Sequence, residues 1–382
     1  MFLKKNVKKV RSIVSGFALA GLTAAALILS ADTAINAQTP DDAAATAPRG
    51  GAANKFLDFN GNGTTDYVTL GFITGGPINW YVTGNPANPL PNQAFIRNFD
   101  YGFASSDAIV VGDYIGDNKA DLAVFRTAPA TSPGPGIWYV SQFPNGTAGV
   151  TLDRAVRWGN ASDVPVTGDY DGDGKADYVV VRANTDGILI WYILYSGTNT
   201  TRRTAFGQLP AAGASLGAPT VFDGADFNGD GRDELIYVTT NASGTQVIYN
   251  VGDATTGAGL ITRAFGNFNT DTSLTPADYT GDGKADFVTC RQTATDGVIV
   301  WYILNSATGV TTGTRFGIAD PTFTGDGDVP VRGDYDGDNR HDIAVWRPSN
   351  QTFYFLSTMF GNVQSQKSGR ATDFPLGGFG GY

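Results

Sequence analysis

The stretch Asp169–Asp177, with the sequence DYDGDGKAD, constrains the fold more than any other part of the chain. Carboxylates occupy its positions 1, 3, 5 and 9, and two glycines lie between them. So many negative charges in so short a segment come together only around a hard cation, and Ca²⁺ takes six to eight oxygen ligands. In Asp-rich calcium loops a glycine stands at position 6, and the backbone carbonyl of position 7 is a further ligand. The apolar run Tyr178–Val181 then predicts a strand where an EF-hand has its second helix.

The same loop occurs six times, at intervals of 52 to 57 residues. A period this regular predicts a repeat architecture in which each repeat is one structural unit. We number the loops 1 to 6 in chain order, and they begin at Asp58, Asp113, Asp169, Asp226, Asp278 and Asp334.

The repeats share one predicted order of elements, shown here for the third. Asp163–Tyr170 is a short strand that enters the loop, and Tyr178–Arg182 leaves it as a second strand. A turn at Asn184–Gly187 is followed by strands at Ile188–Tyr195 and Thr201–Gly207. Four antiparallel strands in about 55 residues make one propeller blade. We therefore predict an all-β fold, a β-propeller of four-stranded antiparallel blades.

The end of the chain predicts how the ring closes. Residues Asp373–Phe379 repeat the strand of Asp163–Asp169 and then stop without a calcium loop. An incomplete repeat is expected where a strand from one terminus completes the blade begun at the other. We predict six blades closed by the N- and C-terminal strands, with seven blades as an alternative.

The first 54 residues do not belong to the repeats. Residues 1–37 resemble a signal peptide, because the positive segment Lys4–Arg11 precedes the uncharged apolar run Ile13–Ser30 and a cleavage point after Ala37. An uncleaved membrane anchor is the alternative. Residues 38–54 are rich in Ala, Pro and Thr, which predicts a flexible linker. The propeller then occupies residues 55–382 of an exported protein that has no membrane span after signal cleavage.

The charge and the cysteine content of the chain argue against nucleic-acid binding and against stabilisation by disulfides. Of the 36 acidic residues, 19 lie at positions 1, 3, 5 or 9 of the six loops, so the acidity belongs mostly to the loops. Removing residues 1–37 takes the net charge from −10 to −14, which disfavours binding to a phosphate backbone and excludes nucleic acid as a partner. The single cysteine, Cys290, can form no internal disulfide, so metal is expected to provide the cross-link that an exported protein of this size needs.

Three features together resemble the FG-GAP repeat family, which is integrin α-like and also called VCBS. They are the loop pattern, the apolar strand after it, and the pairs Phe206-Gly207, Phe265-Gly266 and Phe316-Gly317. The resemblance covers nearly all of residues 55–382. It implies a calcium-binding β-propeller with each ion in the hairpin between the first two strands of a blade. It also implies a role in adhesion, ligand recognition or scaffolding, with loop positions 1, 3, 5 and 9 as side-chain ligands of Ca²⁺.

The candidate metal ligands follow from these positions, with the carbonyl of position 7 added in loops 3 to 6. They are Asp58, Asn60, Asn62 and Asp66 in loop 1; Asp113, Asp117 and Asp121 in loop 2; Asp169, Asp171, Asp173, Lys175 and Asp177 in loop 3; Asp226, Asn228, Asp230, Arg232 and Glu234 in loop 4; Asp278, Thr280, Asp282, Lys284 and Asp286 in loop 5; and Asp334, Asp336, Asp338, Arg340 and Asp342 in loop 6. Loops 3 and 6 have four carboxylates and should bind best, followed by loops 4 and 5. Loop 2 has Ile115 at position 3, and loop 1 has only two carboxylates, so both are weaker candidates.

Other recurring residues have two interpretations each. The aromatic residue at position 2 of every loop is predicted to pack between neighbouring blades. Four arginines that end the second strand could line a ligand pocket, but pairing with a structural carboxylate is favoured. Four tryptophans on the third strand could stack on sugars, but a place in the core is favoured. The single histidine, His341, is predicted to lie at the surface. The arginines are Arg126, Arg182, Arg291 and Arg347, and the tryptophans are Trp80, Trp138, Trp191 and Trp301.

The sequence contains no nucleophile elbow, zinc-protease helix motif or phosphate-binding loop, so we do not expect an enzyme. We predict a non-catalytic, monomeric calcium propeller that binds a protein or a cell-surface glycan. A glycan-binding lectin with pockets between blades is the alternative. An enzyme that acts on polysaccharides is less favoured.

Overall fold

The computed structural model describes residues 56–73, 75–85, 96–104, 106–127, 134–143, 150–209, 220–273, 275–293, 296–320 and 327–377. The predicted signal peptide and linker lie outside these residues, as do Gly378 and Phe379 of the predicted closing segment. The described residues include no helix with the length and hydropathy of a membrane span.

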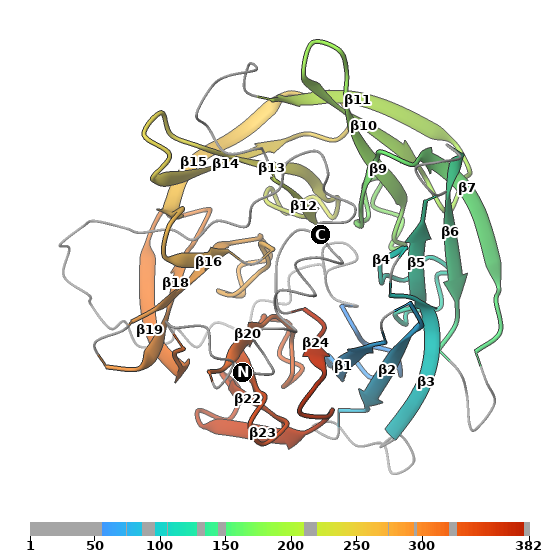
Figure 1. Cartoon of the computed structure of the whole chain (residues 1–382). Coiled ribbons are helices and arrows are strands. Elements are labelled where there is room, and N and C mark those ends of the chain that lie inside the picture. The colour runs from blue at the N-terminus through green and yellow to red at the C-terminus, as the bar shows by residue number, and fades with distance from the viewer. Residues whose placement is uncertain are drawn as a thin grey trace.

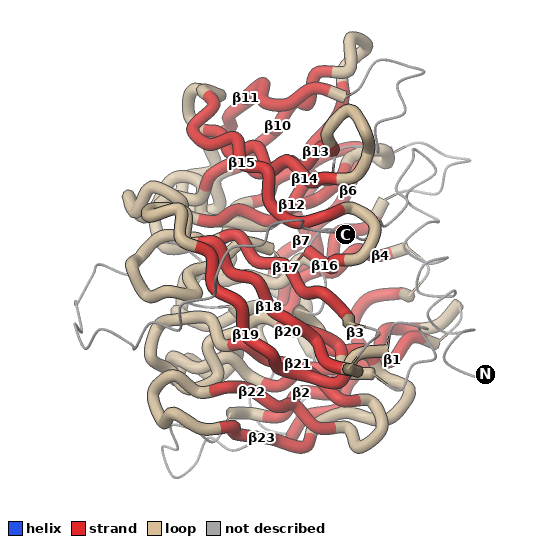
Figure 2. The backbone as a smooth tube through the Cα atoms, turned by 90° about the vertical axis from the view of Figure 1, so that its left-hand side faces the viewer, coloured by secondary structure: helices blue, strands red, loops and turns tan. Residues whose placement is uncertain are grey.

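The described strands form six four-stranded antiparallel sheets around a central axis (Figure 1). The all-β propeller is confirmed with six blades, and the seven-blade alternative is wrong. In each blade the first strand lies nearest the axis and the fourth lies at the rim (Figure 1). Seen from the side, the strands lie between two layers of connecting loops (Figure 2).

The first three blades contain eleven strands in chain order and one strand from the end of the chain. Blade 1 consists of β24 (Phe374–Pro375), β1 (Tyr67–Phe72), β2 (Pro77–Thr83) and β3 (Ile96–Phe103); blade 2 of β4 (Asp107–Ile109), β5 (Leu122–Arg126), β6 (Pro135–Ser141) and β7 (Arg154–Asn160); and blade 3 of β8 (Val164–Val166), β9 (Tyr178–Ala183), β10 (Ile188–Leu194) and β11 (Thr201–Gln208).

The other three blades follow the same order. Blade 4 consists of β12 (Thr220–Ala225), β13 (Glu234–Thr240), β14 (Gln246–Gly252) and β15 (Gly259–Asn267); blade 5 of β16 (Asp271–Ser273), β17 (Phe287–Gln292), β18 (Val298–Leu304) and β19 (Thr311–Ile318); and blade 6 of β20 (Val329–Val331), β21 (Ile343–Arg347), β22 (Thr352–Leu356) and β23 (Val363–Lys367).

The strand order in blade 3 shows why the sequence folds this way. β9 follows loop 3 as a run of valines whose side chains are buried on both faces, as in a sheet covered by neighbours on each side. β11 lies at the rim, and its residues alternate between more and less exposed positions. The predicted strands of this repeat therefore all form, and loop 3 lies between the first and second of them.

The C-terminal strand closes the ring as predicted. In blade 1, β24 pairs with β1, with Thr69 opposite Pro375 and Leu70 opposite Phe374. The amide of Leu376 donates to the carbonyl of Val68 over 3.0 Å. The first blade therefore takes its inner strand from the end of the chain.

The aromatic residues at loop position 2 pack between blades, as predicted, and all six are buried. Tyr114 of loop 2 stacks on Tyr178, the first residue of β9 in the next blade, with ring centroids 4.9 Å apart. Tyr335 of loop 6 stacks in the same way on Tyr67 of blade 1, with centroids 5.3 Å apart. Each loop is thus anchored in the hydrophobic core between its own blade and the next. Cys290 is also buried.

Candidate metal centre

Each loop curls because two of its residues adopt the left-handed backbone conformation. In loop 3 these are Gly172 (φ 78°) and Gly174 (φ 85°), at positions 4 and 6. Asparagine, which tolerates this conformation better than most residues, replaces glycine at position 6 of loops 2 and 6. The curl points the two amides at the carboxylate of position 1. Asp169 accepts from Gly172 over 2.7 Å and from Gly174 over 2.7 Å.

The carboxylate at position 9 closes each loop from the other side. Asp177 accepts from the amide of Tyr170 over 3.0 Å, and the equivalent bond exists in all six loops. Its second oxygen accepts from the amide of Ser196 over 2.9 Å. Ser196 belongs to the hairpin between the third and fourth strands, so both hairpins on this face of the blade meet at Asp177.

The six loops are joined to one another in a closed ring. The amide at position 8 of each loop donates to the carbonyl at position 1 of the preceding loop, over 2.6–2.8 Å. The sixth of these bonds runs from Thr65 of loop 1 to Asp334 of loop 6 and closes the circle. The other donor and acceptor pairs are Ala120 and Asp58, Ala176 and Asp113, Asp233 and Asp169, Ala285 and Asp226, and His341 and Asp278.

Three of the loops gather carboxylate oxygens within 4.8 Å of one another. Loops 3 and 6 do so with positions 1, 3 and 9, and loop 4 with positions 1, 5 and 9. Loops 3 and 6 are the two for which the sequence predicts the tightest binding. The groups are Asp169, Asp171 and Asp177; Asp334, Asp336 and Asp342; and Asp226, Asp230 and Glu234.

Among the residues that the structure describes, the other three loops bring no three carboxylates this close. In loop 1 an amide replaces a carboxylate, and the side chain of Asn60 donates to Asp66 over 2.9 Å. In loop 5, the side chain of Asn305 from the neighbouring hairpin donates to Asp282 over 2.8 Å and to Thr280 over 2.8 Å. Loop 2 places Ile115 where loops 3 and 6 have an aspartate.

Two sets of predicted ligands lie outside the gathered groups. Asp173 and Asp338, at position 5 of loops 3 and 6, accept from the amides at position 7, over 2.9 Å in both loops. The side chains at position 7 are cationic and cover the position 4 glycine of the preceding loop, and the predicted ligand at this position is the backbone carbonyl. These side chains and the glycines that they cover are Lys175 over Gly116, Arg232 over Gly172, Lys284 over Gly229, and Arg340 over Gly281.

The gathered residues fit a hard cation. In loop 6 the Oδ1 atom of Asp342 is buried and has no hydrogen-bond partner among the described residues. Burial, together with the neighbouring charge of Asp336, raises the pKa of Asp342 to about 9. Burial also raises the pKa of Asp177 to about 8 and that of Glu234 to about 8. Buried carboxylates with raised pKa values need either a proton or a cation, and oxygen donors suit Ca²⁺.

The FG-GAP-like repeat model matches residues 169–236 and 226–289. These ranges include loops 3, 4 and 5, and the hydrogen bonds made by positions 1, 8 and 9 of these loops recur in loops 1, 2 and 6. The chain contains FG-GAP-like repeats.

No curated protein matches this chain. Among solved structures it is similar to the crystal structure of "a putative 6-phosphogluconolactonase from Bacteroides uniformis ATCC 8492". The similarity has a TM-score of 0.32 and 12% identity, and it covers 82% of this chain and 97% of that chain. A TM-score this low supports no argument about function.

The Phe-Gly pairs of the FG-GAP-like repeats mark a bulge in the fourth strand. Gly207 and Gly317 have φ values of 105° and 106°, and the register between the third and fourth strands shifts there. At a φ of 105° a residue with a Cβ atom is strained, and a Cβ at Gly207 would also lie 2.9 Å from the side chain of Leu189, so glycine is strongly favoured here. The bulge turns the carbonyl of Phe206 toward the indole N–H of Trp191, which donates to it over 2.9 Å.

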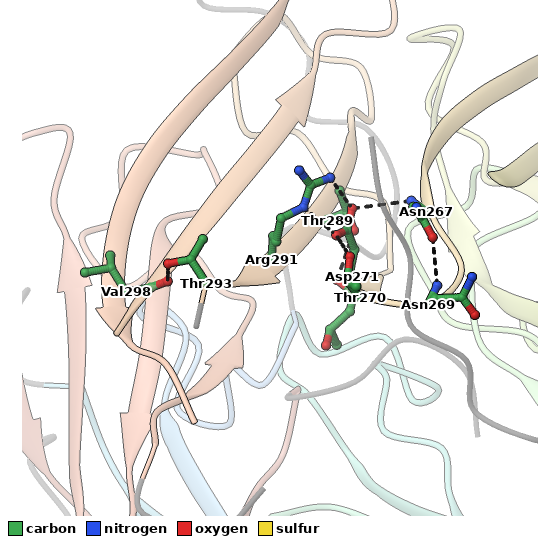
Figure 3. A network of polar contacts seen from close by, with 9 residues as sticks. Asn267, Asn269, Thr270, Asp271, Thr289, Arg291, Thr293 and Val298 are labelled. Atoms are coloured by element: carbon green, nitrogen blue, oxygen red, sulfur yellow. Dashed lines mark hydrogen bonds and ion pairs between the residues drawn. The ribbon is translucent and has the colours of Figure 1, made fainter. Parts of the chain in front are cut away.

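The four recurring arginines pair with aspartates, as favoured from the sequence. In blade 5, Arg291 donates to Asp271 through two nitrogens over 2.8 and 3.1 Å, and Asp271 also accepts from the amide of Asn267 (Figure 3). Because Asn267 ends the preceding blade, each pair joins two blades. The pairs are Arg126–Asp107, Arg182–Asp163, Arg291–Asp271 and Arg347–Asp328. The sequence contained a signal for these partners, because an aspartate precedes loops 2, 3, 5 and 6 by six or seven residues.

His341 is buried, so its predicted surface position is wrong. Its ring packs between Phe56 and Tyr279, with centroids 6.3 and 5.7 Å away. The amide at position 8 is hydrogen-bonded to the preceding loop, so a large side chain at this position is enclosed between the two loops. The four tryptophans of the third strand are fully buried, which confirms their place in the core.

The raised pKa values predict an unusual pH dependence for the metal-free protein. In the unfolded chain an aspartate has its ordinary pKa of 3.8, and folding raises the pKa of Asp177 to about 8 and that of Asp342 to about 9. Both groups therefore hold a proton more tightly in the folded state. This contribution to stability is full below about pH 4 and is lost as the pH rises through about 8 for Asp177 and about 9 for Asp342. We therefore expect the melting temperature in chelator to fall between about pH 5 and pH 8. The same series in millimolar calcium is the control and should be flatter; a melting temperature in chelator that rises over this range would contradict the prediction.

Proposed function

We propose that the chain is an exported, non-catalytic calcium propeller that recognises a partner or acts as a scaffold, with Ca²⁺ fixing the loops on one face. The observation that supports it most directly is the unpartnered Oδ1 of Asp342 beside Asp334 and Asp336. Three oxygens of three carboxylates converge there, and only a cation or a proton relieves their repulsion. The FG-GAP-like match supports the same proposal.

The recurring arginines and tryptophans, which could have lined a ligand pocket, make contacts within the fold instead. The four recurring arginines are bound to aspartates within the fold. The indole N–H groups of Trp80, Trp138 and Trp301 donate to backbone carbonyls of the adjacent strand. Because these tryptophans are also fully buried, their ring faces are not exposed for stacking on sugars, which weakens the lectin alternative. A glycan array probed with calcium-loaded protein distinguishes the lectin from a propeller that binds a protein.

We expect calorimetric titration with calcium to show three bound ions, one each in loops 3, 4 and 6. Extracellular calcium modules bind with dissociation constants of roughly 10⁻⁴–10⁻³ M, and these loops are expected in that range or tighter. Asp336→Asn should reduce the stoichiometry from three to two, because it removes a carboxylate from the loop 6 group. Asp186→Asn, in an exposed turn on the opposite side of the blade, is the matched control. An absence of calcium binding would reject the proposal.

A further inference from the structure

The hairpin between the third and fourth strands forms a second wall of the candidate metal sites. In blade 3 the amide of Ser196 donates to Oδ1 of Asp177 over 2.9 Å. In blade 5 the amide of Ser306 donates to Asp286 over 3.1 Å. In blade 6 the hydroxyl of Ser357 donates to Asp336 over 2.6 Å. The hairpin therefore contacts a predicted ligand in each of these blades.

Two hydroxyl groups in this wall are buried without a partner. The Oγ atoms of Ser196 and Ser306 accept and donate no hydrogen bond among the described residues. Ser196 is only 7% exposed. Buried hydroxyls in native proteins nearly always have a partner, so the Oγ of Ser196 calls for one beyond the described residues.

The position of Ser196 indicates which partner this is. Its Oγ is joined through two carbon atoms to the amide that bonds Asp177, which places it no more than about 7 Å from Oδ1 of that carboxylate. Asp177 belongs to the group with Asp169 and Asp171 in loop 3. One oxygen from each of these three carboxylates and the carbonyl predicted at Lys175 give a Ca²⁺ ion four ligands, fewer than the six to eight that it takes. A neutral hydroxyl adds an oxygen to this shell without adding a fourth negative charge.

We propose that the hydroxyl of Ser196 completes the coordination shell of Ca²⁺ in loop 3, either as a ligand itself or as the partner of a water bound to the ion. This inference rests on the proposed calcium function. Residues from two hairpins then form the metal site, because the nine-residue loop alone does not supply all the ligands.

The test compares Ser196→Ala with Thr198→Ala, a change in the same hairpin whose hydroxyl is exposed and shares a hydrogen bond with Thr200. We expect Ser196→Ala to weaken the binding of one calcium ion by about tenfold, the usual lower bound for loss of a group that supports a metal site. Thr198→Ala should bind calcium as the wild-type protein does. The measurement is equilibrium dialysis with radioactive calcium, with the melting temperature recorded in calcium and in chelator.

The two melting temperatures separate a metal ligand from a merely structural serine. If Ser196 serves the ion, Ser196→Ala lowers the melting temperature in calcium but not in chelator, where the hydroxyl has no partner to lose. An equal decrease in both conditions, or unchanged calcium affinity, would overturn the inference while leaving the proposed function intact. If the wild-type protein binds no calcium, the inference about Ser196 and the proposed function are both rejected. A crystal structure grown in millimolar calcium provides the second measurement, with Ser196 Oγ bonded to the ion or to one of its waters as the supporting result.

Discussion

Chelation of calcium is expected to lower the melting temperature of the propeller by about 10 °C. With free calcium at about a hundred times the dissociation constant, one bound ion stabilises the folded state by about 2.7 kcal/mol, and three ions by about 8 kcal/mol. A domain of this length shifts by about 1 to 2 °C for each kcal/mol. Differential scanning calorimetry in calcium and in chelator measures the shift.

The controls for this prediction follow from the ligand chemistry. Magnesium prefers a smaller octahedral shell and keeps its waters, so it should restore much less of the stability than calcium. Returning calcium to the chelated protein should restore the original melting temperature. A transition that is indifferent to chelator would reject a structural role for the ion.

The hydrogen-bonded ring of loops makes the effect of chelation extend beyond the sites themselves. Loop 3 accepts from position 8 of loop 4 through the carbonyl of Asp169, and it donates to loop 2 through Ala176. Repulsion that opens loop 3 in the absence of the ion therefore removes bonds from both neighbours. For this reason we expect one cooperative transition in chelator, shifted to lower temperature, with no separate unfolding of single loops.

The sequence predicted the parts of the fold that recur with a fixed period. The apolar run after Asp177, the turn at Asn184–Gly187 and the aromatic residue at position 2 each follow from local sequence, and each recurs in register. The closing strand was also predictable, because Asp373–Pro375 repeats the segment before a loop without the loop itself. The short pattern would be weak evidence in one copy, but six copies in register predict the propeller fold firmly.

The features that the sequence did not predict depend on contacts between repeats. Ser196 lies in a hairpin whose sequence resembles an ordinary polar turn, and only the fold brings it to Asp177. Asp233 stands at position 8, outside the ligand pattern, yet it is buried and accepts from the amide of Asp169 over 2.7 Å. His341 occupies the same position in loop 6 and is buried for the same reason. The ring of loops encloses position 8, and a pattern within one repeat contains no information about the repeat beside it.

Replacing Arg182 with alanine is expected to destabilise the propeller by about 3 kcal/mol, because it leaves a buried carboxylate without its charge partner. The side chain of Asp163 has no exposed surface, and Arg182 bonds both of its oxygens over 2.5 and 2.6 Å. Asp163 also accepts from the amide of Asn160 at the end of blade 2, so the variant weakens the junction between blades 2 and 3. Urea denaturation monitored by tryptophan fluorescence gives the free energy of unfolding.

Arg315 and Asp296 provide a matched control pair on the surface. Their side chains are 57% and 41% exposed, although the two atoms lie only 2.5 Å apart. Solvent screens such a pair, so Arg315→Ala should cost less than about 1 kcal/mol. Arg182→Lys should fall between the two, since lysine keeps the charge but cannot bond both carboxylate oxygens in the planar geometry of arginine. Equal losses in Arg182→Ala and Arg315→Ala would show that the recurring arginines do not join the blades, and that packing of the position 2 aromatics alone holds neighbouring blades together.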